Sequence, residues 1–287
     1  MQAIYKKEVK SYLTSMIGYV FIFFILLLEG IYFTAYNLQN AYPLFGTTLS
    51  AVTFIFLILV PVLTMKTIAE ERKQKTDQLL LTAPVSVSEI VLGKFLAVAT
   101  VYAIPVLIIC LYPMIMGKYG TVSYAMAYTA VLGFALLGFA QIAVGVFWSS
   151  VTENPVIAAV VTFIVLFVCY MITGIGSLIP DSSMASLACY MLLVLLAAVW
   201  IYHMIRNLWI AAVIGIAGEA ALAITYVVKS TLFEGSIQKF LSVFDITSHF
   251  DNFTNGILDL QGVVYFLSVI IIFLVLTVQT ITKRRWN

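Results

Sequence analysis

Residues 17–36 read IGYVFIFFILLLEGIYFTAY, and Glu29 is the only charged residue in this stretch. A helix needs about 20 mostly apolar residues to cross a membrane, because each residue rises about 1.5 Å and the hydrocarbon core is about 30 Å thick. Seven further stretches have a similar length and composition. They are residues 49–65, 95–116, 124–148, 156–175, 185–204, 208–228 and 263–281. The pattern predicts about eight spans, within a range of six to eight, because only a short polar break separates the sixth from the seventh.

The composition of the whole chain agrees with membrane spans. Hydrophobic residues make up 63% of the 287 positions and charged residues only 10%, whereas about half of a water-soluble domain is apolar. The sequence therefore predicts an all-α fold, a polytopic transmembrane helical bundle that forms one domain over residues 1–287. The net charge of +2 is small, so we expect membrane lipid around the chain and no nucleic acid as a partner.

The distribution of Lys and Arg predicts the orientation, because these residues accumulate in cytoplasmic loops. With eight spans and a cytoplasmic N-terminus, most of the 15 basic residues fall inside. The inside set is Lys6, Lys7, Lys10, Lys66, Arg72, Lys73, Lys75, Lys94, Arg206, Lys283, Arg284 and Arg285, and the outside set is Lys118, Lys229 and Lys239. We therefore predict a multi-pass protein of the cell (plasma) membrane with both termini in the cytoplasm.

Two segments outside the spans have a mixed character. Residues 1–16 combine apolar and basic side chains, which is typical of an amphipathic elbow helix at the membrane surface; a frayed leader is the alternative. Residues 229–261 form the longest polar stretch on the outer side, yet they contain several phenylalanines. We expect this extracytoplasmic stretch to lie on the membrane or to re-enter it.

The longest cytoplasmic segment, residues 66–94, reads KTIAEERKQKTDQLLLTAPVSVSEIVLGK. Its first half has opposite charges four positions apart, a spacing that stabilises a helix, so we expect the second span to continue out of the membrane as a helix. The pairs are Lys66–Glu70, Glu71–Lys75 and Lys73–Asp77. Pro84 should end this helix, because a proline disfavours helix at the residue before it. Ser86 followed by Glu89 has the form of a capping box that begins another helix.

An apolar patch lies in the second half of this segment. It consists of Leu79, Leu80, Leu81, Val85 and Val87, which is more apolar surface than a free loop in water carries. Either the patch lies in the lipid headgroups or a soluble partner docks on it.

One set of residues in this segment, and a second set near the C-terminus, carry a family resemblance. The first set is Glu70, Glu71, Arg72, Thr76, Leu79, Leu80, Leu81, Pro84, Val85, Ser86, Glu89, Ile90, Gly93 and Lys94. It resembles the cytoplasmic loop of ABC type 2 transporter permeases. The second set is Ser248, His249, Phe250, Phe253, Gly256, Asp259, Tyr265, Phe266, Leu274, Thr277, Arg285 and Trp286. It resembles the C-terminal signature of the gliding-motility type of these permeases.

The resemblance implies an ABC type 2 exporter-like fold in which residues 66–94 form a coupling helix that contacts a separate ATP-binding subunit. It assigns the contact to Glu70, Glu71, Arg72, Thr76, Leu79, Leu80 and Pro84. ATP and Mg would then be bound by the partner and no cofactor by this chain. The chain agrees, since it has no G-x-x-x-x-G-K-[ST] phosphate loop. A second permease subunit, identical or different, is also implied.

Another short cytoplasmic turn, residues 149–155, lacks Lys and Arg. Glu153 and Asn154 in this turn are candidates for a second contact with the ATP-binding subunit, and a plain connector is the alternative. The chain also departs from the family pattern. Lys75 stands where Gly is common, Gln78 stands where Glu is common, and the family usually has six spans, so residues 185–228 would be an extra pair.

Two carboxylates lie inside apolar stretches, where a charge at the helix centre costs about 2.5–3.5 kcal/mol. They are Glu29 and Glu219, and each could pair with a neighbour, be protonated or face a polar route through the membrane. An ion-coupled secondary transporter that uses Glu219 is therefore one alternative to the permease. A membrane-embedded enzyme is another, but no nucleophile, acid–base pair or metal set can be assembled from the sequence.

Overall fold

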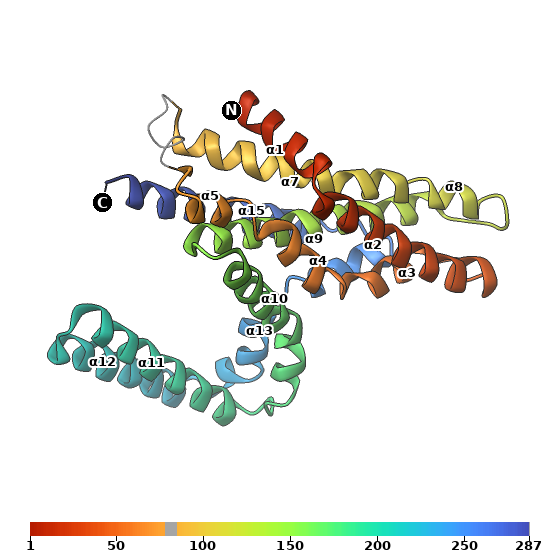
Figure 1. Ribbon diagram of the computed structural model, residues 1–287. Helices are drawn as coiled ribbons and strands as arrows, with labels where there is room; N and C mark the ends of the chain where they lie inside the picture. Colours follow the sequence, from red (N-terminus) through yellow and green to blue (C-terminus); the bar gives the residue numbers. More distant parts are fainter. Residues whose placement is uncertain (78–84, 287) are drawn as a thin grey trace. The chain divides into compact units, whose positions relative to one another are not determined.

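The computed structural model describes residues 1–77 and 85–286, and every regular element in these residues is helical. The chain divides into two compact units (Figure 1). Unit 1 contains Met1–Phe167 and Ile246–Asn287, and unit 2 contains Val168–Asp245. Among the described residues, six helices are long and apolar enough to cross a membrane, and two bent helix pairs raise the number to as many as eight. The predicted all-helical fold with six to eight spans is therefore confirmed.

Unit 1 contains most of the helices. They are α1 (Gln2–Thr14), α2 (Met16–Tyr32), the π-helix η1 (Phe33–Gln39), α3 (Phe45–Thr53), α4 (Phe56–Thr64), α5 (Ala69–Lys73), α7 (Val87–Ile109), α8 (Tyr112–Met116), α9 (Tyr124–Val151), the first part of α10 (Pro155–Ser177), η3 (Ser248–Phe250), α14 (Asp251–Thr254) and α15 (Leu260–Trp286). Figure 1 shows the start of α1 and the end of α15 at the same end of this unit as α5.

The core of unit 1 is built around α9, which packs against α3, α4, α7, α14 and α15. Phe56, Tyr102 and Phe134 are fully buried and contact one another, and the Tyr102 hydroxyl donates a hydrogen bond of 2.7 Å to the carbonyl of Phe134. A glycine at position 138 is needed, since a Cβ atom there would overlap the Tyr102 ring. Small residues in a span indicate close helix packing, and α9 is closely packed at this glycine.

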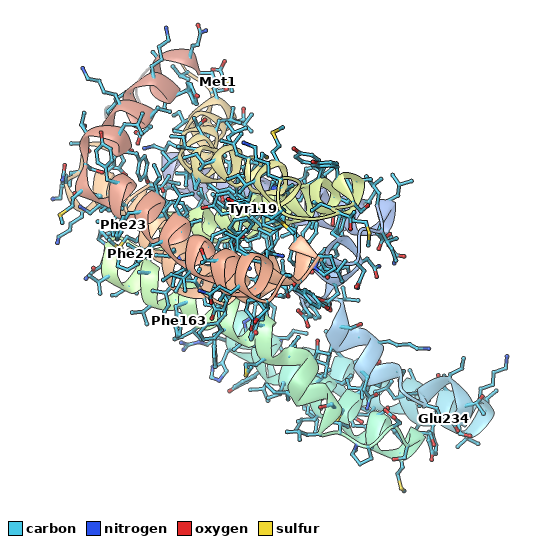
Figure 2. All side chains as sticks on the ribbon, turned by 90° about the vertical axis from the view of Figure 1, so that its right-hand side faces the viewer. Met1, Phe23, Phe24, Tyr119, Phe163 and Glu234 are labelled. Carbon is cyan, nitrogen blue, oxygen red and sulfur yellow. The ribbon has the colours of Figure 1, made fainter. Side chains whose placement is uncertain are left out.

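The outer surface of unit 1 is strongly apolar. Phe23 and Phe24 of α2 are 58% and 43% exposed, and Phe163 of α10 is 38% exposed; all three project from the ribbon in Figure 2. A soluble domain rarely exposes such a continuous apolar surface. This surface is suited to contact with lipid chains.

The C-terminal residue set serves the packing of unit 1. Phe250, Phe253 and Phe266 are fully buried, and a Cβ atom at position 133 of α9 would collide with Phe253. Asp259 begins α15, because its Oδ1 atom accepts a hydrogen bond of 2.8 Å from the backbone N–H of Gln261. Its Oδ2 atom accepts one from the Asn252 amide, also 2.8 Å long, and this bond lowers the pKa of Asp259 below its ordinary value.

The second span differs from the prediction of a continuous helix. Helices α3 and α4 are bent by 60°, and a turn at residues 65–68 separates α4 from α5. The cause of the turn is Ser149 of α9. Its hydroxyl accepts hydrogen bonds from the backbone N–H groups of Ile68 and Ala69 and donates one to the Met65 carbonyl, each 3.1 Å long. These backbone groups therefore bond to Ser149 instead of forming the backbone hydrogen bonds that would continue the helix.

Unit 2 consists of α11 (Ser183–Ile205), α12 (Leu208–Val228), η2 (Ser230–Phe233), α13 (Ser236–Ser242) and the last part of α10. Helices α11 and α12 form a hairpin (Figure 1). Arg206 has a left-handed conformation, with φ of 56°, and the Asn207 side chain caps the start of α12. The polar break at Arg206 thus separates two helices, and residues 185–204 and 208–228 are not one merged span. Helix α12 and the following η2–α13 segment are bent by 116°.

Candidate functional site

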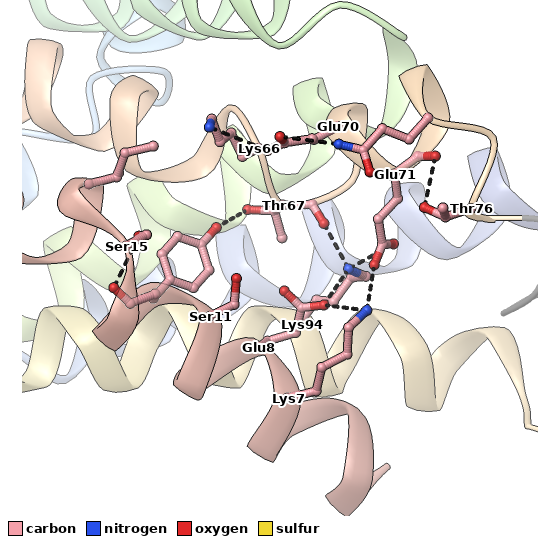
Figure 3. Close-up of a pocket in the computed structure, with 13 residues that line it drawn as sticks. Lys7, Glu8, Ser11, Ser15, Lys66, Thr67, Glu70, Glu71, Thr76 and Lys94 are labelled. Atoms are coloured by element: carbon pink, nitrogen blue, oxygen red, sulfur yellow. Dashed lines mark hydrogen bonds and ion pairs between the residues drawn. The ribbon is translucent and has the colours of Figure 1, made fainter.

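Lys94 of α7 connects three segments that lie far apart in the sequence (Figure 3). Its side chain is only 2% exposed, and its Nζ atom lies 2.9 Å from Oε1 of Glu8, 2.9 Å from Oε2 of Glu71 and 2.9 Å from the carbonyl of Thr67. Glu8 belongs to α1 and Glu71 to α5. We call Lys7, Glu8, Thr67, Glu71 and Lys94 the Lys94 junction.

The charges of the Lys94 junction balance. Lys7 lies 3.3 Å from Glu71 and 3.8 Å from Glu8, so two ammonium groups face two carboxylates. A buried charge is tolerated only with partners of opposite sign and with its hydrogen bonds satisfied. The Lys94 ammonium has three donors, and the three acceptors around it satisfy all of them. The junction therefore fixes α1 and α5 to the start of α7.

Helix α1 packs along α7 and is fixed to it at several points. Tyr12 is buried, and its hydroxyl is hydrogen-bonded to the Leu63 carbonyl at 3.2 Å and to Thr67 at 3.0 Å. Burial raises the pKa of Tyr12 above its ordinary value, so the phenol stays neutral. Tyr5 is hydrogen-bonded to Thr100 of α7 at 3.0 Å. The exposed lysines Lys6 and Lys10 lie on the outer side of α1.

A second set of contacts joins α5 to the last residues of α9. Besides the bonds of Ser149, the Arg72 guanidinium donates a hydrogen bond to the Ser150 carbonyl. Burial, and to a smaller degree the nearby Arg284, lowers the pKa of Arg72 to about 10, so the side chain remains charged at neutral pH. Arg284, near the end of α15, lies 2.6 Å from Glu153 in the turn at residues 149–155. The start of residues 66–94, the end of α9 and the end of α15 are thus linked.

A cavity of about 650 Å³ opens beside the Lys94 junction, between α1 and α5. Most of the residues that line it are polar, and they carry both signs of charge, with Lys66 and Glu70 on one side and Lys7 and Glu8 on the other (Figure 3). Lys66 and Glu70 form the ion pair that their spacing predicts, with 3.5 Å between Nζ and Oε2.

Comparison with known proteins agrees with this architecture. The family model described as ABC-2 family transporter protein matches residues 2–284. The chain belongs to this family. No curated protein matches it in a sequence comparison. Because it belongs to the ABC-2 family, the chain is the multi-pass membrane subunit of an ABC transporter. It is a transport subunit and not an enzyme by itself, and the family implies a partner ATP-binding subunit. This assignment does not favour the ion-coupled alternative.

The contact residues expected in the ABC-2 permease fall into two groups. Glu71 and Arg72 turn inward, where Glu71 joins the Lys94 junction and Arg72 is 6% exposed. Thr76, Glu153 and Asn154 are exposed, and Glu70 is half-buried. Leu79, Leu80, Leu81 and Pro84 lie outside the described residues. The contact with a partner remains a prediction for both groups.

Three details of the loop test the sequence patterns directly. The capping box is confirmed, because Ser86 and Glu89 exchange backbone-to-side-chain hydrogen bonds of 3.3 Å. The pairing of Glu71 with Lys75 is wrong; in the described part of the chain the ion pairs of Glu71 are with Lys7 and Lys94. Val87 is only 8% exposed, so it packs within the protein and adds little to an apolar surface patch.

Lys75 ends α5 in a conformation that suits glycine. Its φ angle is 58°, in the left-handed region that costs a non-glycine residue about 1–2 kcal/mol. The N–H of Thr76 donates to the Glu71 carbonyl at 2.9 Å and the N–H of Lys75 to the Arg72 carbonyl at 3.0 Å. This bonding pattern is the Schellman motif, in which Gly is the usual residue. The Gly that is common here in permeases of this type fits the same conformation.

The two intramembrane carboxylates occupy different environments in this permease. Glu29 of α2 is 0% exposed, and neither carboxyl oxygen has a hydrogen-bond partner in the described residues. Glu219 of α12 is half-buried, and its Oε1 atom is shielded without such a partner among those residues. A role of either carboxylate in a polar route through the membrane remains a prediction.

The sequence patterns did not predict the contacts of three residues of the site, although Lys94 belongs to the residue set that carries the family resemblance and Ser149 begins the turn at residues 149–155. Glu8 and Lys94 are 86 positions apart, so no local spacing relates them. Ser149 looks like an ordinary helix-end serine. The available signal was a lysine next to a glycine inside an otherwise apolar helix, at Gly93 and Lys94, because a charge in such a position requires a partner.

Proposed function

We propose that a separate ATP-binding subunit docks on residues 66–94 and on the turn at residues 149–155, and that it powers transport through this permease. One observation carries the proposal. Ser149 and Arg72 bond the two segments to each other at one end of unit 1. A partner that contacts both segments would therefore meet a single connected surface, with Thr76 and Glu153 among its exposed residues.

The Lys94 junction supplies the route from this surface into the membrane. A displacement of α5 acts on Glu71, and through Lys94 it acts on α1 and α7 together. ATP can shift the equilibrium between two conformations only if the partner's contacts differ between them. In this proposal the partner binds ATP and Mg and hydrolyses the nucleotide, and this chain binds neither.

The remaining features of the transporter are proposed from the family and from the charge distribution. The chain pairs with a second permease subunit and exports its substrate. It lies in the cell membrane with both termini in the cytoplasm. The residue set from Ser248 to Trp286 supports the gliding-motility type of permease. The excess of Lys and Arg in the inner segments supports the orientation.

The test is copurification of this chain with a candidate ATP-binding protein, taken from the neighbouring gene, after mild detergent extraction. The variant to compare with wild type combines Thr76→Arg, Leu80→Asp and Glu153→Lys, which leaves the buried Lys94 junction intact. The matched control is Tyr119→Arg, because Tyr119 is 79% exposed in the loop after α8, away from α5.

A complex that forms with wild type and the control but not with the triple variant supports the docking surface. Thermal unfolding of the triple variant within a few degrees of wild type shows that the fold is kept. If the triple variant copurifies as well as wild type, the surface is wrong. If wild type fails to bind any candidate ATP-binding protein, the proposal of an ATP-driven permease fails.

A further inference from the structure

The cavity of about 650 Å³ between α1 and α5 lies where two spans leave the membrane. Ser15 and Ile17 line it on one side, and the first span begins at Met16. Lys66 lines it on the other side, and the second span ends shortly before this residue, at Thr64. Small-molecule sites commonly have volumes of about 300–1,000 Å³. The cavity is therefore large enough for a ligand and lies at the height of the lipid headgroups.

The charges that line the cavity balance. Three lysines and three glutamates contribute them. They are Lys7, Lys66, Lys94, Glu8, Glu70 and Glu71. A ligand with a net charge would disturb this balance, whereas a ligand that carries one positive and one negative group would keep it. Electrostatic complementarity therefore favours a zwitterion.

The inner and outer parts of the lining differ in how closely their charges are paired. In the inner part, the Lys94 ammonium has three acceptors at 2.9 Å. In the outer part, Lys66 lies 3.5 Å from Glu70, and the Gln74 amide reaches Glu70 at 3.4 Å. Both distances exceed the usual N–H···O range of about 2.7–3.2 Å, and the side chains of Lys66 and Glu70 are 43% and 36% exposed. Such a pair contributes about 0–1 kcal/mol, so its two charges can bind a ligand at little cost.

An apolar stripe on α2 leads away from the cavity along the outer surface of unit 1. Ile17 lines the cavity, and the stripe continues at intervals of three or four residues, on one face of the helix. Its further members are Val20, Phe24, Leu27 and Ile31. Phe24, Leu27 and Ile31 are 43%, 41% and 55% exposed, and the last two also line a groove of about 570 Å³. Hydrocarbon chains attached to a ligand in the cavity would thus lie against an apolar surface.

We propose that the cavity binds the headgroup of an aminophospholipid, in which a phosphate lies close to a primary ammonium group. The headgroup and the ion pair of Lys66 with Glu70 align head to tail. The phosphate accepts a hydrogen bond from Lys66, and the ammonium donates one to Glu70. Hydrogen bonds between ionised groups are about twice as strong as those between neutral groups. The acyl chains cover the stripe on α2.

This chemistry distinguishes the aminophospholipid from other ligands. A trimethylammonium headgroup has no N–H to donate to Glu70, and an anionic lipid has no cation. A soluble phosphoethanolamine compound carries the same two charges but has no acyl chains for the stripe. The proposal does not depend on the ATP-binding subunit.

Native mass spectrometry of the full chain, purified in mild detergent without an ATP-binding subunit, tests the proposal. It compares the binding of phosphatidylethanolamine, phosphatidylcholine and phosphatidylglycerol with identical acyl chains, and glycerophosphoethanolamine serves as a competitor without chains. The test variant combines Lys66→Gln with Glu70→Gln, which keeps the net charge. Its matched control combines Glu153→Gln with Arg284→Gln, because this ion pair is also exposed, at 64% and 43%, but does not line the cavity.

A second variant fills the cavity without a change of charge. Ser11 of α1 is exposed and lines the cavity, so Ser11→Trp should block it. Ala3→Trp is the control, because Ala3 is exposed on the same helix but does not line the cavity. Thermal unfolding shows which variants keep the fold, and the Ser11 variant provides the test if the double glutamine variant does not fold.

We expect phosphatidylethanolamine to bind about three- to tenfold more tightly than the other two lipids, which is the net effect of about one hydrogen bond. The preference should disappear in both test variants and persist in both controls. An equal concentration of glycerophosphoethanolamine should not displace the lipid. Equal binding of the three lipids, or a preference that a folded test variant keeps or a control loses, would overturn the proposal. So would displacement by glycerophosphoethanolamine, because the ligand would then be a soluble zwitterion.

Discussion

The Nζ atom of Lys94 lies 2.9 Å from the Oε1 atom of Glu8, and this ion pair joins α7 to α1 although the two residues are 86 positions apart in the sequence. We expect Lys94→Met to destabilise the protein by about 3–5 kcal/mol, because it removes the buried cation between the Glu8 and Glu71 carboxylates and leaves them only the exposed Lys7. Thermal unfolding in detergent measures the loss.

Lys66→Met is the control for this change. Lys66 also pairs with a glutamate, but its side chain is 43% exposed, so its loss should cost about 0.2–0.5 kcal/mol. Adding Glu8→Gln to Lys94→Met should recover part of the lost stability. Equal effects of the two lysine variants would contradict the structural role of the Lys94 junction.

Two adjacent serines provide a second prediction. Ser149 and Ser150 are both 0% exposed, but the Ser149 hydroxyl makes three hydrogen bonds, whereas the Ser150 hydroxyl makes none in the described residues. Ser149→Ala leaves two buried N–H groups unpaired and should cost about 2–4 kcal/mol, while Ser150→Ala should be neutral or slightly stabilising. Denaturant unfolding of the two variants side by side would reveal any departure from this order.

Lys75 provides a prediction of increased stability. Replacing it with Gly should stabilise the protein by about 1 kcal/mol, because Gly has no Cβ atom and adopts the left-handed conformation without strain. Lys75→Ala removes the same charge but keeps the Cβ atom, so it should give no such gain. The idea fails if both variants shift the unfolding temperature equally.

Glu29 should also be replaceable with a gain in stability. Glu29→Met fills a similar volume and removes a buried carboxyl group that has no hydrogen-bond partner in the described residues, so the expected gain is about 1–3 kcal/mol. Glu29→Gln keeps an unpaired polar group and should gain less. A lower unfolding temperature for Glu29→Met would show that the carboxyl group has a stabilising partner in the assembled transporter.

Asp259 provides a pH dependence. Its pKa in the folded protein is below the ordinary value of 3.8, chiefly because Asn252 donates a hydrogen bond to it. A carboxyl group with a lowered pKa stabilises the fold above its unfolded-state pKa, and this contribution disappears as the pH falls through the folded-state value. The unfolding temperatures of wild type and Asp259→Ala should therefore differ at neutral pH and converge below pH 3.8.

Asp259→Asn is the matched control, since its side-chain oxygen can still cap α15. It should lower the unfolding temperature less than Asp259→Ala at neutral pH. A constant difference between wild type and Asp259→Ala across this pH range would mean that the carboxylate is not the stabilising form.

The sequence predicted the elements whose signal is local. Residues 17–36 and the other apolar stretches correspond to helices, because a span needs only length and hydrophobicity. The capping box at Ser86 and the ion pair of Lys66 with Glu70 depend on residues three or four positions apart, and both are present. These features could be predicted without knowledge of the tertiary structure.

The parts that the sequence did not predict depend on contacts between distant segments. The turn after α4 forms because Ser149 competes for backbone groups at Met65, Ile68 and Ala69, and nothing near these residues signals it. Likewise, Glu71 is four positions from Lys75 but pairs with Lys94 instead. A buried ammonium group with fixed acceptors competes better for a carboxylate than an exposed lysine in a left-handed turn.

The Lys94 junction also has a consequence for biosynthesis. Helix α1 emerges from the ribosome before α7, but Glu8 and Tyr5 have their partners on α7, at Lys94 and Thr100. The N-terminal helix therefore cannot reach its final position until the segment that contains these residues has been synthesised and inserted. Helix α1 is thus fixed in place only after the two spans that follow it have been made, and its docking marks the point at which α7 has been inserted.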